Sequence, residues 1–162
     1  MLKPILEAWS SMIVRRWHAH DVMSNTTDLT GAHASRVCVL ALRLNPKLSR
    51  RGIIYALTHD IGEKRAGDFP YTFKRDNPET AAKLGVYEEQ VAAELGFGWG
   101  DLDPTEKQLV GMCDWIDSYL WAALHYPHIV NEEAWINQRA VCQLTASKLG
   151  LRDEIKTLMR RP

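Results

Sequence analysis

Apolar residues recur every three or four positions along most of this chain, and nowhere do they alternate with polar residues over a useful length. The clearest example is the stretch 105–125, where Leu109, Val110, Cys113, Ile116, Leu120 and Leu124 follow this spacing. Such spacing is typical of amphipathic helices, whereas half-buried strands alternate with a period of two residues. The sequence therefore predicts an all-α fold.

Seven segments carry the helical spacing, and we expect a single domain over residues 1–162 that forms a bundle of six or seven helices. The expected helices cover residues 4–17, 33–44, 49–61, 78–95, 105–125, 132–149 and 152–160. In the first of them, one apolar face is expected to hold Leu6, Trp9, Ile13 and Trp17. A chain of 162 residues is long enough to bury one hydrophobic core without disulfides or a structural metal to stabilise it.

The composition limits the class of partner. Lys plus Arg and Asp plus Glu number 20 each, so the net charge is zero, which argues against binding nucleic acid by general attraction. A small anionic ligand in a local basic pocket remains compatible with this balance. We expect no membrane segment and no signal peptide. The three cysteines, Cys38, Cys113 and Cys142, are expected to be reduced core residues of a cytoplasmic protein.

Several candidate functional side chains lie close together in the stretch 57–68, at the end of a predicted helix: His59, Asp60, Glu63 and Asp68. Glu63 follows His59 by one i+4 step, so the two side chains lie near the same face. Neighbouring residues diverge by about 100° on a helix, so His59 and Asp60 can share an ion only if that ion lies beside the helix. Other elements must then supply the remaining ligands.

Two further predicted helices offer such ligands. His33 lies in the first turn of one, and Asp114 lies in the middle of the apolar stretch 105–125. An aspartate in so apolar a helix needs a partner, either a metal ion or a buried arginine, because burying an unpaired carboxylate is costly. Two imidazoles and two carboxylates suit Mn²⁺, Co²⁺, Fe²⁺, Ni²⁺ or Mg²⁺ in a six-coordinate site, whereas structural zinc sites favour thiolates. Such an ion polarises a phosphoryl group and lowers the pKa of a bound water.

The order His, His-Asp, Asp across a helical chain resembles that of the HD-domain metal-dependent phosphohydrolases. Segments 16–17, 32–35, 59–63 and 67–70, together with Asp114, are similar to those of bacterial 5′-deoxynucleotidases and of phage dATP triphosphohydrolases. The resemblance covers about residues 12–125. It implies that one divalent ion (Co²⁺, Mn²⁺, Mg²⁺, Ni²⁺, Fe²⁺ or Zn²⁺) is bound by His33, His59, Asp60 and Asp114.

The resemblance also implies roles for residues around the ion. Glu63 would be the acid/base or water-orienting carboxylate, and Asp68 would assist near the leaving oxygen or the attacking water. Trp17 would stack on a nucleobase, and Arg16 would donate to a sugar or phosphate oxygen. The expected phosphate contacts are Lys74 and, as a weaker expectation, Arg75.

The chain departs from the family pattern at two positions. Gly62 stands before Glu63, where the family usually has serine, and the carboxylate is retained. Ala32 stands before His33, where the deoxynucleotidases tend to carry glutamate. The sequence therefore does not identify the residue that bonds to the ring nitrogen of His33 that does not face the ion.

The activity that the resemblance favours is that of a dATP triphosphohydrolase, which releases deoxyadenosine and phosphates, and the short chain favours the phage type. If a phage encodes it, its location is the host cytoplasm. Cations available for additional phosphates are Lys64, Arg65, Lys74, Arg75 and Lys83. The alternatives are a 5′-deoxynucleotidase that acts on monophosphates and a non-catalytic nucleotide-binding helical module. A metal-dependent nuclease is disfavoured by the neutral net charge.

The six tryptophans are relevant to whether the protein forms an oligomer. Trp115, Trp121 and Trp135 fit either a subunit contact or ordinary core packing, and related enzymes are commonly oligomeric, so a homo-oligomer is expected. The preferred base, the native metal and the oligomer size are open.

Overall fold

The computed structural model describes residues 2–159, which form nine α-helices and two short 3₁₀ turns without a strand. The helices are α1 (Leu2–Ser11), α2 (Thr30–Leu44), α3 (Arg50–Thr58), α4 (Glu63–Ala66), α5 (Tyr71–Asp76), α6 (Pro78–Glu94), α7 (Pro104–His125), α8 (Glu133–Lys148) and α9 (Arg152–Leu158). The all-α class is confirmed. The number of helices exceeds the expected six or seven because α4 and α5 are additional short helices.

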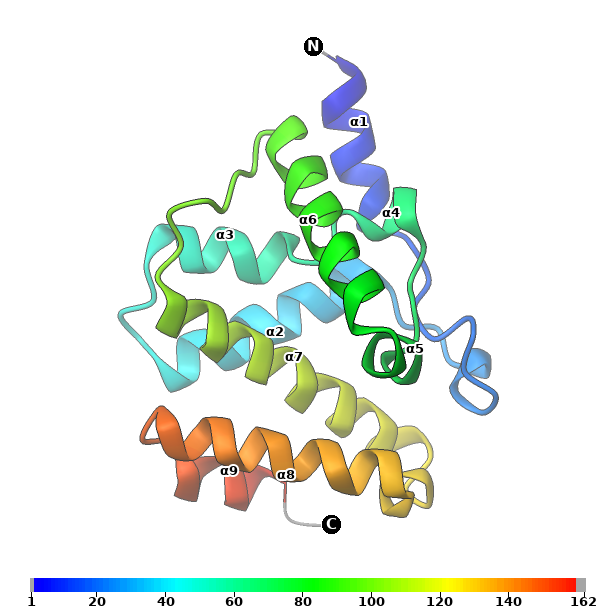
Figure 1. The fold of residues 1–162 in the computed structure, drawn as a ribbon, viewed down its shortest axis with the longest axis vertical. Helices are drawn as coiled ribbons and strands as arrows, with labels where there is room; N and C mark the ends of the chain where they lie inside the picture. Colours follow the sequence, from blue (N-terminus) through cyan, green and yellow to red (C-terminus); the bar gives the residue numbers. More distant parts are fainter. Residues whose placement is uncertain (1, 160–162) are drawn as a thin grey trace.

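Helix α7 is the centre of the fold. It packs against α2 and α3 on one side and against α8 on the other, and α9 covers α8 (Figure 1). Side chains that are fully buried between these helices include Val37, Ala41, Val110, Cys113, Ile116, Ala122 and Ile155. Helix α7 begins at Pro104 because Asp103 accepts bonds from the N–H groups of Thr105 and Glu106, and proline suits the first helical position.

The first helix is shorter than the spacing predicts. It ends at Ser11, because the backbone of the next residues bonds to residues 28–31, at the start of α2: Arg16 N–H donates to Asp28 O at 3.0 Å, and Gly31 N–H donates to Met12 O at 2.8 Å. Trp17 therefore lies in a loop and not on the helix. The side chains of the expected apolar face are largely exposed, with Leu6 at 61%, Trp9 at 65% and Ile13 at 54%.

The segment between α3 and α6 folds more tightly than a simple connector. Helices α4 and α5 form here in four and six residues, which is too short for the apolar period to indicate a helix. Gly62 allows α6 to approach the turn before α4, because a Cβ at this position would lie 3.0 Å from Glu88 Cα. Over residues 2–159, no helix combines the length and the apolar character that crossing a lipid bilayer requires.

Candidate metal centre and its cavity

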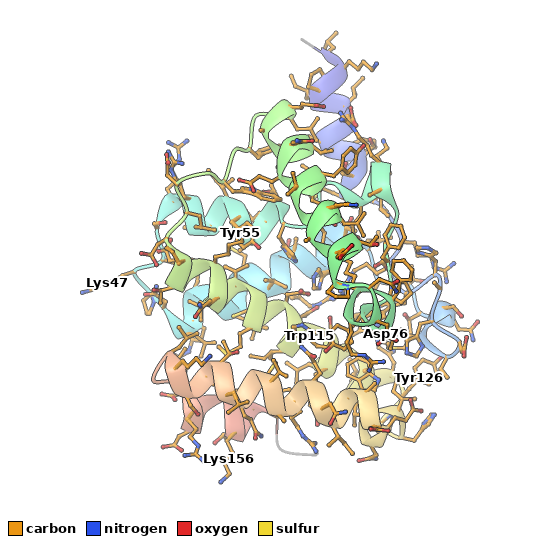
Figure 2. All side chains as sticks on the ribbon, viewed as in Figure 1. Lys47, Tyr55, Asp76, Trp115, Tyr126 and Lys156 are labelled. Carbon is orange, nitrogen blue, oxygen red and sulfur yellow. The ribbon has the colours of Figure 1, made fainter. Side chains whose placement is uncertain are left out.

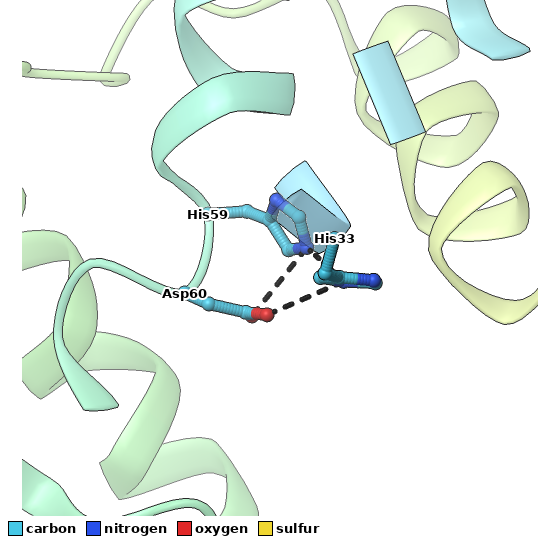
Figure 3. A group of neighbouring side chains, drawn as sticks. All are labelled: His33, His59 and Asp60. Atoms are coloured by element: carbon cyan, nitrogen blue, oxygen red, sulfur yellow. Dashed lines mark hydrogen bonds and ion pairs between the residues drawn. The ribbon is translucent and has the colours of Figure 1, made fainter. Parts of the chain in front are cut away.

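Three candidate ligands converge where α2 meets the turn that follows α3. His33 Nε2 lies 3.3 Å from His59 Nε2 and 3.4 Å from Asp60 Oδ2, and His59 Nε2 lies 3.4 Å from Asp60 Oδ1 (Figure 3). Ligand atoms of the three residues all lie within 4.8 Å of one another, so this group can hold a metal ion. Helix α3 ends at Thr58, and the turn that follows it brings the neighbouring His59 and Asp60 to the same point.

Both imidazoles have their second nitrogen engaged, which leaves Nε2 for an ion. His59 Nδ1 lies 3.0 Å from the carbonyl oxygen of Ala56, and His33 Nδ1 lies 2.7 Å from Asp117 Oδ2. Ligating histidines usually donate this second N–H to a carbonyl or a carboxylate, which fixes the ring and its tautomer. The donor set therefore fits a divalent cation.

Asp114 approaches the same point from α7, where it lies close to both His33 and the buried Arg16. Its Oδ1 lies 3.1 Å from His33 Nε2 and 3.9 Å from the Arg16 guanidinium. Burial acts against the charge, yet the bond to His33 and the charges of His59 and Arg16 hold the pKa of Asp114 well below its usual range. Asp114 therefore remains a carboxylate at the point where the ligands meet.

A cavity of about 460 Å³ opens beside these ligands. Its lining includes six acidic residues, Asp21, Asp60, Glu63, Asp68, Asp114 and Glu132, but only two permanently charged cations, Arg16 and Lys74. So negative a cavity favours a bound cation, because like charges destabilise one another unless a counter-charge is present. Its aromatic residues are Trp17, Phe69, Tyr71, Trp115 and Trp135. Tyr71 of α5 meets the ring of Trp115 edge-on, with centroids 4.6 Å apart. Figure 2 shows where Trp115 lies among the side chains of the molecule.

Glu63 is the buried acid of the cavity. It begins α4 with 6% of its surface exposed, and its Oε2 contacts no donor within residues 2–159. Burial raises the pKa of Glu63 well above its usual value, and the charges of Asp60 and Asp68 raise it further. A carboxyl group with a raised pKa can carry a proton near neutral pH, as a general acid must.

Asp68 and Trp17 are joined across the cavity wall. The backbone N–H of Trp17 donates to Asp68 Oδ2 at 3.3 Å, and the Trp17 indole N–H donates to Asp28 Oδ2 at 3.4 Å. Trp17 has a φ of +64°, a left-handed conformation that is rare for a bulky side chain. Such strain persists where the surroundings fix the residue, and it is frequent at functional sites. The Arg16 guanidinium lies 4.8 Å from the centroid of the Trp17 ring.

The predicted phosphate contacts separate in the structure. Lys74 lines the cavity, where burial lowers its pKa but the carboxylates of Glu88 and Glu63 raise it overall. Arg75 instead pairs with Asp76, with Nε 2.7 Å from Oδ1, and lies outside the cavity lining. Arg65 also lies outside it and pairs with Glu7 and Glu94.

Sequence reasoning missed a cluster of charged residues behind the site. Arg36 bonds to both Asp28 and Asp117, with distances from 2.7 to 3.0 Å, and Arg16 Nη1 lies 3.2 Å from Asp28 Oδ2. Asp28 and Asp117 are buried. Asp117 follows Asp114 by three positions in an apolar helix, and that spacing was the one available signal.

Two of the tryptophans considered for a subunit contact have partners within the chain. Trp135 is buried, and the Trp121 indole N–H donates to Thr26 Oγ1 at 3.2 Å.

In comparisons with known proteins, no family model, no curated protein and no solved structure matches this chain. The resemblance to the HD-domain phosphohydrolases therefore depends on the sequence motifs alone. What the structure establishes is an all-α protein with a His33, His59 and Asp60 group that can hold a metal ion.

Proposed function

We propose that this chain is a metal-dependent phosphohydrolase of the HD-domain type that acts on small 2′-deoxynucleotides. The observation that carries the proposal is the meeting of His33, His59 and Asp60, with Asp114 3.1 Å from His33, beside a cavity lined by acidic side chains and aromatic rings. A divalent ion bound there would supply positive charge for phosphate oxygens and would acidify a water molecule.

Residues of the cavity would carry out proton transfer and bind the substrate. Glu63 holds or releases a proton at the leaving oxygen, because its buried carboxyl group has a raised pKa. Asp68 stays oriented by the N–H of Trp17 and accepts a proton from the attacking water. Lys74 binds a phosphate oxygen, and the ring of Trp17 packs against the base or the sugar.

The position of the cations bears on the number of phosphates in the substrate. The resemblance favours dATP, and Lys64, Arg65, Lys74, Arg75 and Lys83 lie nearby in the sequence as candidate cations for the outer phosphates. Of these five, Lys74 alone lines the described cavity, and Lys64 bonds to Ser10 at another surface. A triphosphate needs more counter-charge than a monophosphate, so this placement favours the second candidate, a 5′-deoxynucleotidase.

Product analysis tests the activity and separates the two substrates. The protein is stripped of metal, reloaded with Mn²⁺ or Co²⁺, and incubated with dATP, dGTP, dAMP, dTMP, ATP and AMP before the products are separated by anion exchange. We expect hydrolysis of a deoxynucleotide that depends on the added metal. Release of triphosphate from dATP identifies the triphosphohydrolase, and release of phosphate from dAMP identifies the nucleotidase.

The matched variants are Asp60→Asn, which removes a ligand, and Asp76→Asn, which changes an exposed aspartate outside the cavity. We expect no activity in the first and full activity in the second, with both folded by circular dichroism. Unchanged turnover in Asp60→Asn would refute the assignment. A protein that binds the metal yet hydrolyses none of the nucleotides is instead the non-catalytic binding module.

A further inference from the structure

We propose that Asp117 is a positioning residue of the metal centre, which holds His33 with Nε2 turned toward the ion. The inference rests on the metal site of the proposed function and adds a residue to it. Asp117 is not a ligand in this assignment, because its carboxylate meets the far side of the imidazole ring.

The tautomer of His33 follows from its contacts. Asp117 Oδ2 lies 2.7 Å from His33 Nδ1, and the His33 ring is fully buried. A carboxylate accepts a hydrogen bond and cannot donate one, so Nδ1 must carry the proton. The lone pair of a neutral ring is then on Nε2, the atom that faces His59, Asp60 and Asp114.

Helix α2 cannot supply this acceptor. Its sequence from Thr30 to Leu44 contains no aspartate and no glutamate. Asp117 reaches His33 from α7, one helical turn after Asp114, so α7 provides both a candidate ligand and the residue that orients another. This pairing answers the question that Ala32 left open in the sequence.

Asp117 is itself fixed in place. Arg36 Nε donates to its Oδ1 at 2.7 Å, a second Arg36 nitrogen donates to its Oδ2 at 2.9 Å, and the residue is 3% exposed. Arg36 is held in turn by Asp28 and by the ring of Trp121, whose centroid lies 4.7 Å from the guanidinium carbon. The carboxylate therefore has no freedom to turn away from His33. Partners of this kind typically change metal affinity 10- to 100-fold when they are removed.

The test compares Asp117→Asn with Asp28→Asn. Both residues are buried aspartates that accept bonds from Arg36, but Asp28 touches no histidine. Co²⁺ is titrated into each metal-free protein and followed by calorimetry and by visible absorption, and the free energy of unfolding is measured in urea. We expect both variants to lose stability, and only Asp117→Asn to bind Co²⁺ about 10- to 100-fold more weakly. Equal weakening in both variants would show a general structural role and overturn the proposal.

A second measurement needs no variant and therefore no assumption about folding. Long-range ¹H–¹⁵N spectra of the imidazoles in the Zn²⁺-loaded protein report which nitrogen of each histidine carries the proton. We expect His33 to carry it on Nδ1, and a proton on Nε2 would overturn the proposal. If the unaltered protein binds neither Co²⁺ nor Zn²⁺, the proposed function and this inference both fail. If it binds and hydrolyses but Asp117→Asn matches it in affinity, the inference alone fails.

Discussion

The two sides of the candidate site are built differently. His33 and Asp114 come from α2 and α7, helices of 15 and 22 residues that pack on each other in the core. The opposite side comes from residues 63–76, where α4 and α5 are only four and six residues long. Groups on long packed helices are held more exactly in place than groups on short exposed segments, which open at lower free energy. We infer that the first side fixes the ion and that the second adapts to the substrate.

Glu63→Gln gives the largest expected effect and tests the adaptable side. The substitution removes the group that the proposed function assigns to proton transfer, so kcat should fall by about 10²- to 10⁴-fold. Stability should change little, because one oxygen of Glu63 already lacks a partner in the described structure. Steady-state kinetics and urea unfolding measure the two effects. A large loss of stability with kcat preserved would assign Glu63 to the rigid side.

Ile116→Ala and Phe73→Ala compare the two sides through packing. Ile116 of α7 is fully buried, so its truncation should lower the free energy of unfolding by about 2–5 kcal/mol. Phe73 of α5 is 38% exposed, and its truncation should cost less than about 1 kcal/mol. Urea denaturation of both variants checks the difference. Similar losses would show that the two sides are equally rigid.

The free energy of unfolding of the metal-free protein should depend on pH through His33, which lies on the rigid side of the site. Burial and Arg16 lower the pKa of His33, but the bonds to Asp114 and Asp117 raise it overall, from 6.5 to about 9. A raised pKa in the folded state stabilises the protein below pH 6.5, and this contribution is lost as the pH rises through 9. The loss should be roughly 3 kcal/mol in urea unfolding with EDTA present. His33→Asn should abolish this change of the unfolding free energy with pH. An unfolding free energy of the unaltered protein that does not change over this pH range would contradict the expectation.

Lys74→Ala should give the smallest of these effects, with Arg75→Ala as its control. Lys74 lines the cavity, whereas Arg75 pairs with Asp76 outside it. Losing this one half-buried cation, the proposed phosphate contact, should raise KM about 10-fold, which corresponds to about 1.4 kcal/mol, with kcat nearly unchanged. Steady-state kinetics of the two variants measure the effect. An equal rise in Arg75→Ala would place phosphate binding at the exposed end of α5.

The periodic parts of the chain were predictable from sequence, and the parts set by distant contacts were not. Helices α6, α7 and α8 begin and end within one residue of the expected positions, because long apolar periods determine them. The early end of α1 and the left-handed Trp17 depend on backbone bonds to residues 28–31, which no local pattern encodes. The meeting of His33, His59 and Asp60 was expected from motif order, whereas Asp117 as the partner of His33 needed the three-dimensional structure.

The bond between His33 and Asp117 also constrains the order in which the protein can assemble. The two residues are 84 positions apart, and Arg16 reaches Ser118 across 102 positions. Contacts this distant require a large loop to close, which has an entropic cost. During synthesis, α2 leaves the ribosome long before α7 does, and until then His33 has neither its acceptor nor Asp114 beside it. An early metal ion would therefore meet a chain without these contacts, and a centre that uses Asp114 and Asp117 could form only once α7 has been made.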